Sequence, residues 1–170
     1  GPKDERSDER VMKVAAMAAK KMGDQGGRKA AFYFGSGNVA AGICGAFIGG
    51  HGQDLCRTES SLHPLAELRW HGGSDEDCQQ GRDLGESVNL TRRLVNLPPN
   101  HIYPESVAGE MQQLADEVGL GIEIWDEDRL VEENCQALLA VARGSVRKPR
   151  LVILNYKGGA EDQAPVALVG

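Results

Sequence analysis

The stretch SDEDCQQGRDLGESVNLTRRLVNLPPN occupies residues 74–100 and predicts one long helix with a defined beginning and end. Ser74 followed by Asp77 resembles a capping box, with Asp in place of the usual Glu. We expect the helix to cover about residues 75–95, because Pro98 and Pro99 cannot continue its hydrogen-bond ladder. The chain is therefore expected to divide near residues 70–75, where the loop-forming sequence before this helix lies.

Tertiary packing should be needed to hold this helix. Gly81 and Gly85 lie inside it, and each costs about 1 kcal/mol relative to alanine. The side chains expected to pack recur at helical spacing on one face. They are Leu84, Val88, Thr91 and Val95.

The sequence before residue 74 predicts helix, strand and helix, which is the order of an α/β domain. Ser7 is a suitable N-cap for the first helix, and Gly23 is expected to stop it. The apolar run 30–34 predicts a buried strand. The small-residue segment 39–48 predicts a second, closely packed helix, because Ala, Gly and Cys let backbones approach each other.

The sequence after residue 100 restarts with another mixture of helices and strands. Pro104 suits the first turn of a helix that Gly119 ends, and the acidic segment 126–128 suits a further helix start. The apolar run 136–142 is ambiguous between helix and strand. Three further runs predict strands, at 121–125, 150–156 and 165–169. The fold class predicted for the whole chain is α/β.

Composition limits the classes of protein that this chain can belong to. It has 170 residues, of which 41% are hydrophobic and 26% charged, which is typical of a soluble globular protein rather than a disordered tail. The charged segment 1–10 predicts no secretory signal, and no window approaches the roughly 18 apolar residues of a membrane span. A net charge of −6 argues mildly against binding a phosphate backbone.

One glycine-rich turn could bind a nucleotide. The pattern Gly35-x-Gly37-x-x-Ala40 follows a predicted strand and opens a predicted helix, as the dinucleotide fingerprint does. Asp54 lies nearly where a ribose ligand belongs, but after a glycine-rich break rather than at the end of a second strand. The alternative is a tight turn that simply needs small residues, and we favour it because a single fingerprint is a weak signal.

The remaining polar side chains predict no catalytic arrangement. The histidines are expected in loops without metal-ligand spacing, and the cysteines are expected to be reduced, partly buried thiols of a cytosolic protein. The carboxylates of 123–128 fit a solvated helix start better than acid–base chemistry. Four basic side chains are expected on a solvated loop rather than in a phosphate site. These sets are His51, His63, His71 and His101; Cys44, Cys56, Cys78 and Cys135; and Arg143, Arg147, Lys148 and Arg150.

The second half of the chain resembles a known family. Residues 89–100, NLTRRLVNLPPN, resemble the N-x-A-R-D-L-V-N-T-P-P-N segment of the leucine (cytosol) aminopeptidases, which are dinuclear metallopeptidases. The likeness continues through Pro104-Glu105, LLAVARGS at 138–145 and PRLVILNYKG at 149–158, and ends with PVALVG at 165–170. The segment 42–56 resembles the family's N-terminal domain more loosely. Arg93, Leu97 and Tyr103 depart from the family pattern.

The resemblance implies a protein that is incomplete here. In the family, V-A-L-V-G is followed by K-G-x-T-F-D-[ST]-G-G, whose Lys and Asp bind metal ions, and this sequence stops at Gly170. We therefore expect no catalytic, cofactor-binding or metal-binding residue within 1–170. The implied domains are a partial N-terminal α/β (macro-like) domain at 1–73, a connecting helix at 74–97, and the start of an α/β catalytic domain at 98–170.

The activity that the resemblance implies is proteolysis by a metalloprotease: a hydrolase that releases N-terminal amino acids from peptides. It also implies two divalent ions (manganese, zinc or magnesium) in the complete protein, a homohexamer, and a place in the cytoplasm. Two alternatives stay open from the sequence. One is a nucleotide or ADP-ribose binding module that uses Gly35 and Gly37, and the other is a non-catalytic assembly or DNA-binding subunit.

Overall fold

The computed structural model describes residues 7–33, 38–52, 54–56, 58–59, 64–160 and 163–170. The chain folds as two compact units, Gly1–Leu97 and Pro98–Gly170, and each is described by itself. Helices and strands occur together in both units, which confirms the predicted α/β class. Among the described residues, no helix is both long and apolar enough to cross a membrane.

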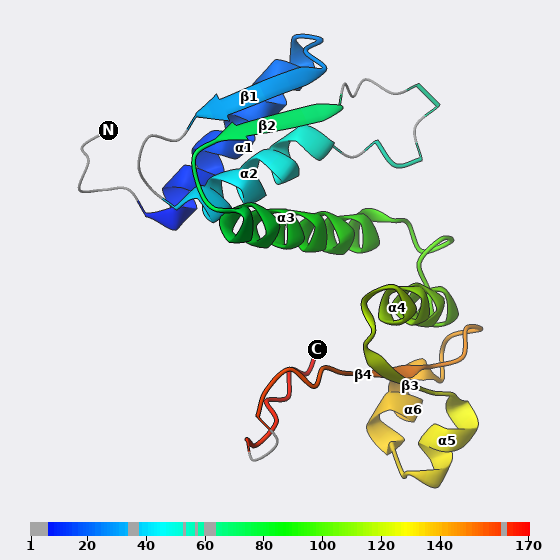
Figure 1. The fold of residues 1–170 in the computed structure, drawn as a ribbon. Coiled ribbons are helices and arrows are strands. Elements are labelled where there is room, and N and C mark those ends of the chain that lie inside the picture. The colour runs from blue at the N-terminus through cyan, green and yellow to red at the C-terminus, as the bar shows by residue number, and fades with distance from the viewer. Residues whose placement is uncertain (1–6, 34–37, 53, 57, 60–63, 161–162) are drawn as a thin grey trace. The chain divides into compact units, whose positions relative to one another are not determined.

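The first unit places two helices on a pair of parallel strands (Figure 1). Its elements are α1 (Asp8–Asp24), β1 (Lys29–Tyr33), α2 (Val39–His51), β2 (Glu67–His71) and α3 (Asp75–Asn96). Strand β2 was not predicted from the sequence. It pairs with β1 in the register Lys29↔Glu67 to Tyr33↔His71. Phe32 and Trp70 stack with ring centroids 5.2 Å apart and pack on the buried core of α1 and α2.

Glycines let α1 and α2 approach closely, as the small-residue segment predicted. Gly45 faces Met12 of α1, and Gly49 faces Ala16. A Cβ atom on either glycine would overlap backbone atoms of α1, so only glycine fits at these contacts. Ser7 caps α1 as expected: its Oγ accepts a hydrogen bond from the backbone N–H of Arg10 at 3.3 Å.

The beginning of α3 was predicted correctly, but its packing face was not. The backbone N–H of Asp77 donates to Ser74 Oγ (3.1 Å), and that of Ser74 donates to Asp77 Oδ2 (2.9 Å), which completes the capping box. The buried residues of α3 are Gly81, Gly85 and Asn89. The expected face is exposed instead, with Leu84 at 49% and Val95 at 76%.

The glycines of α3 explain this difference. A Cβ on Gly81 would lie 2.6 Å from the carbonyl oxygen of Ala40 and 2.7 Å from Cβ of Ile43. A Cβ on Gly85 would lie 2.6 Å from Cβ of Phe47. The two helices meet where side chains are smallest, so α3 presents its glycine face to α2 and turns Leu84 towards solvent.

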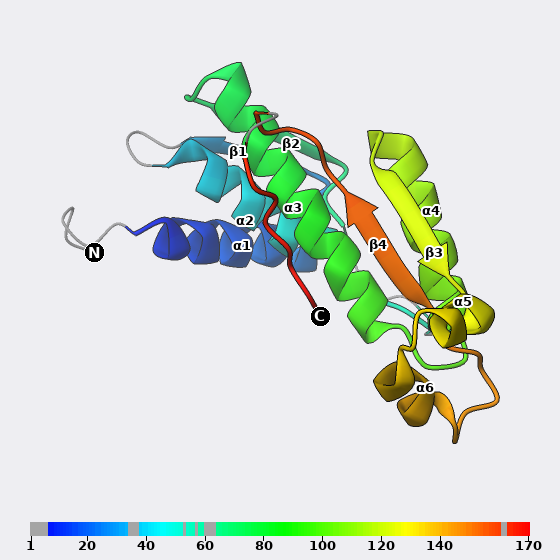
Figure 2. The same cartoon turned by 90° about the horizontal axis from the view of Figure 1, so that it is seen from below.

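The second unit combines helices with an antiparallel strand pair. Its elements are α4 (Pro104–Val118), β3 (Gly121–Trp125), α5 (Glu127–Glu132), α6 (Gln136–Ala142) and β4 (Leu151–Asn155). Strands β3 and β4 run from the pair Gly121↔Asn155 to the pair Trp125↔Leu151. Helix α4 packs against both strands (Figure 2). The ambiguous run 136–142 proves to be helical.

The ends of α4 follow the sequence signals. Pro104 lies in its first turn, and Gly119 ends it in the left-handed conformation with φ of 73°. Tyr103 stands at the N-cap, and its backbone N–H donates to Ser106 Oγ at 2.9 Å. Ser106 therefore supplies a capping contact from inside the helix.

The strand predicted at 165–169 is not present, and that prediction was wrong. These residues have no strand structure, and Val166, Leu168 and Val169 are between 88% and 97% exposed. A strand requires a neighbour for its backbone hydrogen bonds. Within the part of the chain that the structure describes, β4 pairs with β3 and residues 165–169 have no strand beside them.

Candidate functional site

The N-terminus of α2, where the proposed nucleotide turn leads, is already occupied by side chains. Gly35 and Gly37 themselves lie outside the described residues. Asn38 caps α2: its Oδ1 accepts from the backbone N–H of Ala41 at 3.0 Å, and its Nδ2 donates to Asp8 Oδ2 at 3.0 Å. The carboxylate of Asp8 thus lies beside the helix N-terminus that a pyrophosphate would need. Its negative charge disfavours a phosphate there.

The second part of the dinucleotide pattern is also misplaced. The acidic ribose ligand of that fold is expected about 20 residues beyond the fingerprint, in the same βαβ unit. Here β2 ends at His71, whose ring stacks on Tyr33 with centroids 5.3 Å apart. Asp54 lies between α2 and β2 and belongs to neither element. The first unit therefore has a parallel βαβ order without the acidic residue that would bind ribose.

Histidine and cysteine side chains are scattered. His51 ends α2 and His71 ends β2, so these two belong to regular elements and not to loops as predicted. His101 is exposed in the turn before α4, and His63 lies outside the described residues. Within the described ranges, no three His, Cys, Asp or Glu side chains lie close enough together to hold a metal ion.

The four cysteines are free thiols, as predicted. Cys44 is buried in α2, and burial raises the pKa of its thiol. Cys56 is exposed, and Cys78 and Cys135 are half-buried. A raised pKa keeps Cys44 protonated, so it behaves as a small apolar side chain of the core.

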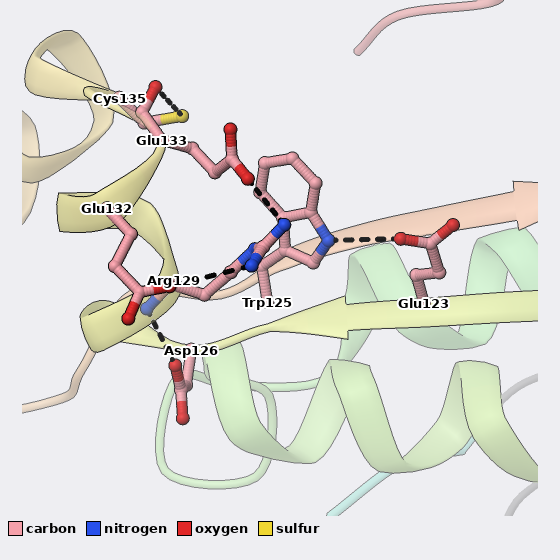
Figure 3. A network of polar contacts seen from close by, with 7 residues as sticks. All are labelled: Glu123, Trp125, Asp126, Arg129, Glu132, Glu133 and Cys135. Atoms are coloured by element: carbon pink, nitrogen blue, oxygen red, sulfur yellow. Dashed lines mark hydrogen bonds and ion pairs between the residues drawn. The ribbon is translucent and has the colours of Figure 1, made fainter.

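The acidic segment 123–128 caps and pairs, as the sequence predicted (Figure 3). Asp126 Oδ1 accepts from the backbone N–H of Arg129 at 3.0 Å and so caps α5. Trp125 Nε1 donates to Glu123 Oε2 at 3.2 Å. The guanidinium of Arg129 pairs with Glu132 and Glu133 and lies 5.4 Å from the centre of the Trp125 ring. These carboxylates have structural partners and no acid–base geometry.

A polar contact that sequence reasoning missed joins α3 to the end of α2. We call Asn89 and Arg92 the α2–α3 clamp. Asn89 Nδ2 donates to the carbonyl oxygen of Phe47 at 3.2 Å, and Arg92 Nη1 donates to that of Ile48 at 3.1 Å. Arg92 Nη1 also donates to Asn89 Oδ1 at 3.0 Å. The only signal in the sequence was the spacing of three residues, which places both side chains on one helix face.

The surface of the described residues includes two hollows that are lined in part by charged side chains. The first, of about 360 Å³, lies beside β1 and β2 and is lined by Lys29, Ala31, Glu67 and Arg69, among others. Its charges pair with one another: Lys29 Nζ lies 2.9 Å from Glu67 Oε2, and Arg69 binds the same carboxylate. Hydrogen bonds from Lys29 and Arg69 lower the pKa of Glu67. Every charged side chain that lines this hollow therefore has a partner, with two cations sharing one carboxylate.

The second hollow is lined by two of the four basic side chains that follow α6, Arg147 and Arg150, whereas Arg143 and Lys148 do not line it. It measures about 470 Å³ and is lined by α6, Ser145, Arg147, Pro149, Arg150 and Pro104. Lys148 pairs instead with Glu127, with its Nζ 2.6 Å from Glu127 Oε2. Arg150 Nη1 donates to the carbonyl oxygen of Pro149 at 2.8 Å. The guanidinium of Arg147 lies 3.9 Å from the centre of the Tyr103 ring. The predicted solvated loop thus forms one wall of a groove.

Comparison with known proteins identifies relatives along the whole chain. Residues 89–170 match the catalytic domain of the cytosol aminopeptidase family. A protein of Rhodopirellula baltica named "Probable cytosol aminopeptidase" is 37% identical over 174 residues, which cover all of this chain and 34% of that protein. A protein of the same name from Syntrophotalea carbinolica is 48% identical over 92 residues, or 54% of this chain and 18% of that one.

Solved structures of related proteins have a similar fold to this chain. A bottromycin maturation enzyme in complex with Mn has a TM-score of 0.79 and 27% identity, covering 90% of this chain and 34% of its own. A mutant tomato leucine aminopeptidase shares the fold, with a TM-score of 0.78 at 22% identity over 88% of this chain and 33% of its own. The chain spans about a third of the length of the relatives that it matches throughout. Neither a nucleotide-binding module nor a DNA-binding subunit is supported by these matches.

Proposed function

Since this chain belongs to the cytosol aminopeptidase family, we propose that it is part of a metal-dependent aminopeptidase that releases N-terminal amino acids from peptides. One observation carries this proposal. The match to the family's catalytic domain covers residues 89–170 and includes the blocks from Asn89 onwards that resemble the family in the sequence. The relative with 37% identity extends the likeness to the N-terminal part of the chain.

We further propose that residues 1–73 belong to the family's N-terminal domain, that 74–97 are the connecting helix, and that 98–170 begin the catalytic domain. The compact units of this structure support a division after Leu97. Helix α3 is held to the first unit by its contacts with α2 and by the α2–α3 clamp. The proposed connecting helix is thus anchored to the first unit along much of its length.

Two divalent metal ions belong to this proposal, with manganese, zinc and magnesium as the candidates. The described residues do not fit such a pair of ions, because they contain no group of three potential ligands. We propose that another part of the protein contributes the ligands and the catalytic residues. The neighbouring structure that was solved with Mn supports a divalent metal. Such ions polarise a carbonyl group and activate a bound water.

A homohexamer in the cytoplasm completes the proposal. The name that the relatives share, cytosol aminopeptidase, supports the location. Free cysteines are consistent with a reducing compartment. Sedimentation of the natural protein that carries this segment tests the hexamer.

Activity measurements test the central proposal. The natural protein that carries this segment should hydrolyse leucyl anilides with added manganese or zinc, and a chelator should abolish the activity. The 170-residue chain alone should be inactive in the same assay, because the proposed ligands lie outside it. Chelator-sensitive turnover by the rigorously purified chain would refute the proposed place of the ligands, and an inactive natural protein would refute the proposed activity.

A further inference from the structure

The groove beside α6 has an apolar floor and a cationic rim. We call it the α6 groove and define it by Leu138, Val141, Ser145, Arg147 and Arg150, with Pro104 at its edge. Leu138 is 42% exposed and Val141 is 87% exposed, so both offer apolar surface to a partner. Helix α6 contributes no fully buried residue. Its apolar face is therefore uncovered by the other described residues of this chain.

The segment that forms most of the α6 groove has charged side chains of one sign. Segment 136–150 contains Arg143, Arg147, Lys148 and Arg150 and no Asp or Glu, in a chain whose net charge is −6. Lys148 is neutralised by Glu127. Among the described residues, no acidic side chain pairs with Arg147, whose guanidinium lies over the Tyr103 ring and is exposed. A stacked guanidinium is held in position for a carboxylate without paying the whole ordering cost on binding.

From this geometry we propose that the α6 groove binds an acidic polypeptide segment that also carries leucine-like side chains. A carboxylate of the partner pairs with Arg147, and the neighbouring apolar side chains cover Leu138 and Val141. Arg150 adds a second cation on the same rim. This inference does not depend on the aminopeptidase activity, because it rests on the groove alone.

The apolar residues of the groove favour a peptide over a nucleic acid as its partner. A phosphate backbone is bound by cations and hydrogen-bond donors and gains little from exposed valine and leucine. A peptide with alternating acidic and apolar side chains uses both features. The negative net charge of the chain also opposes a long polyanion more than a short acidic segment.

A titration with a defined probe tests the proposal. The probe is a fluorescent, capped peptide of alternating glutamate and leucine, and its binding to the 170-residue chain is followed by polarisation at stated salt. Arg147→Gln should raise Kd about tenfold or more, as expected for a lost charge-assisted contact. Val141→Asp should weaken binding to a similar extent by repelling the carboxylates. Val141 is 87% exposed, so this variant should fold normally.

Matched controls make the result specific. Arg82→Gln removes an exposed arginine of α3 in the first unit and should leave Kd unchanged within about twofold. A glutamate–serine peptide tests the apolar floor and should bind at least about tenfold more weakly.

Four results would each overturn the proposal: no binding of the glutamate–leucine probe, equal losses in Arg147→Gln and Arg82→Gln, equal binding of the serine peptide, or tighter binding of duplex DNA. The titration is repeated on the natural protein that carries this segment. If the probe binds the 170-residue chain but not the natural protein, the groove is covered within the natural protein. That result would also overturn the proposal.

Discussion

Replacing Gly81 by alanine should destabilise the first unit, because the added methyl group would collide with α2. Its Cβ would lie 2.6 Å from the carbonyl oxygen of Ala40 and 2.7 Å from Cβ of Ile43. Both neighbours are buried, and neither is the free end of a flexible side chain. The helices must therefore separate to admit the methyl group.

The magnitude follows from two opposing effects. Overpacking a well-packed contact costs about 1–3 kcal/mol. Alanine returns about 1 kcal/mol relative to glycine inside a helix. Because the obstacle includes a backbone oxygen, we expect the larger part of the cost and a net loss of about 1–2 kcal/mol in the free energy of unfolding. For a unit of this size, that lowers Tm by roughly 5–10 °C.

Two substitutions serve as controls. Gly109→Ala lies in α4, where nothing lies within 4 Å of the added Cβ, so it should stabilise the second unit by about 0.5–1 kcal/mol. Leu84→Ala removes a side chain that is 49% exposed and should cost about 1 kcal/mol or less. Urea unfolding measures all three variants. Trp70 reports on the first unit in a Trp125→Phe background, since these are the two tryptophans of the chain.

The sequence pattern alone predicts the reverse order of the two losses, with Leu84→Ala the more damaging substitution. If Leu84 faced the core, its truncation would cost about 2–5 kcal/mol. Gly81 would then be exposed, and Gly81→Ala would be neutral or stabilising. That pair of results would refute the packing of α3 on its glycine face.

Three further predictions concern single contacts. Asn89→Ala should cost about 1–3 kcal/mol of unfolding free energy in urea titrations, because it breaks the buried α2–α3 clamp, and an unchanged midpoint would contradict this. Hydrogen bonds from the backbone and side chain of Ser74 lower the pKa of Asp77, so its contribution is present above the ordinary carboxyl pKa and is lost as pH falls through the lowered value. Asp77→Asn should therefore flatten the acid limb of a stability–pH curve, and an unchanged acid limb would count against the capping box. The exposed run 165–169 should cause self-association in sedimentation, which serine at Val166 and Leu168 should reduce, whereas a monomeric parent chain would contradict this.

Four local signals at helix ends were read correctly from the sequence, whereas Gly23, which was expected to stop α1, lies inside that helix. Ser7, Ser74, Pro104 and Gly119 each act within four residues of the position that they specify. Their chemistry depends on neighbouring backbone groups, which the sequence itself supplies. The helix starts and the left-handed end of α4 therefore required no knowledge of tertiary structure.

Long-range features were read less well. The packing face of α3 was assigned to its large apolar residues, but close approach to α2 selects Gly81 and Gly85 instead. Strand β2 carries charged and half-buried side chains, so its apolar pattern is weak, and only pairing with β1 reveals it. The run 165–169 has strong strand propensity and no partner among the described residues. In each case the structure of a segment depends on the element that packs or pairs with it, and the local sequence does not identify that element.

The residues that carry the family resemblance can have a structural role in this chain. Residues 89–100 carry the most specific likeness to a peptidase, yet Asn89 and Arg92 in that segment donate to the carbonyl oxygens of Phe47 and Ile48 near the end of α2. Of these two, only the carbonyl of Ile48 belongs to the last four of the helix. Carbonyl groups at a helix end lack intrahelical donors and carry partial negative charge. An amide and a guanidinium are suitable donors for them, and neither group is arranged here to act on a substrate. Two residues of the motif that resembles the family are thus explained by helix packing, because Asn89 and Arg92 fix α3 to α2 within the first unit.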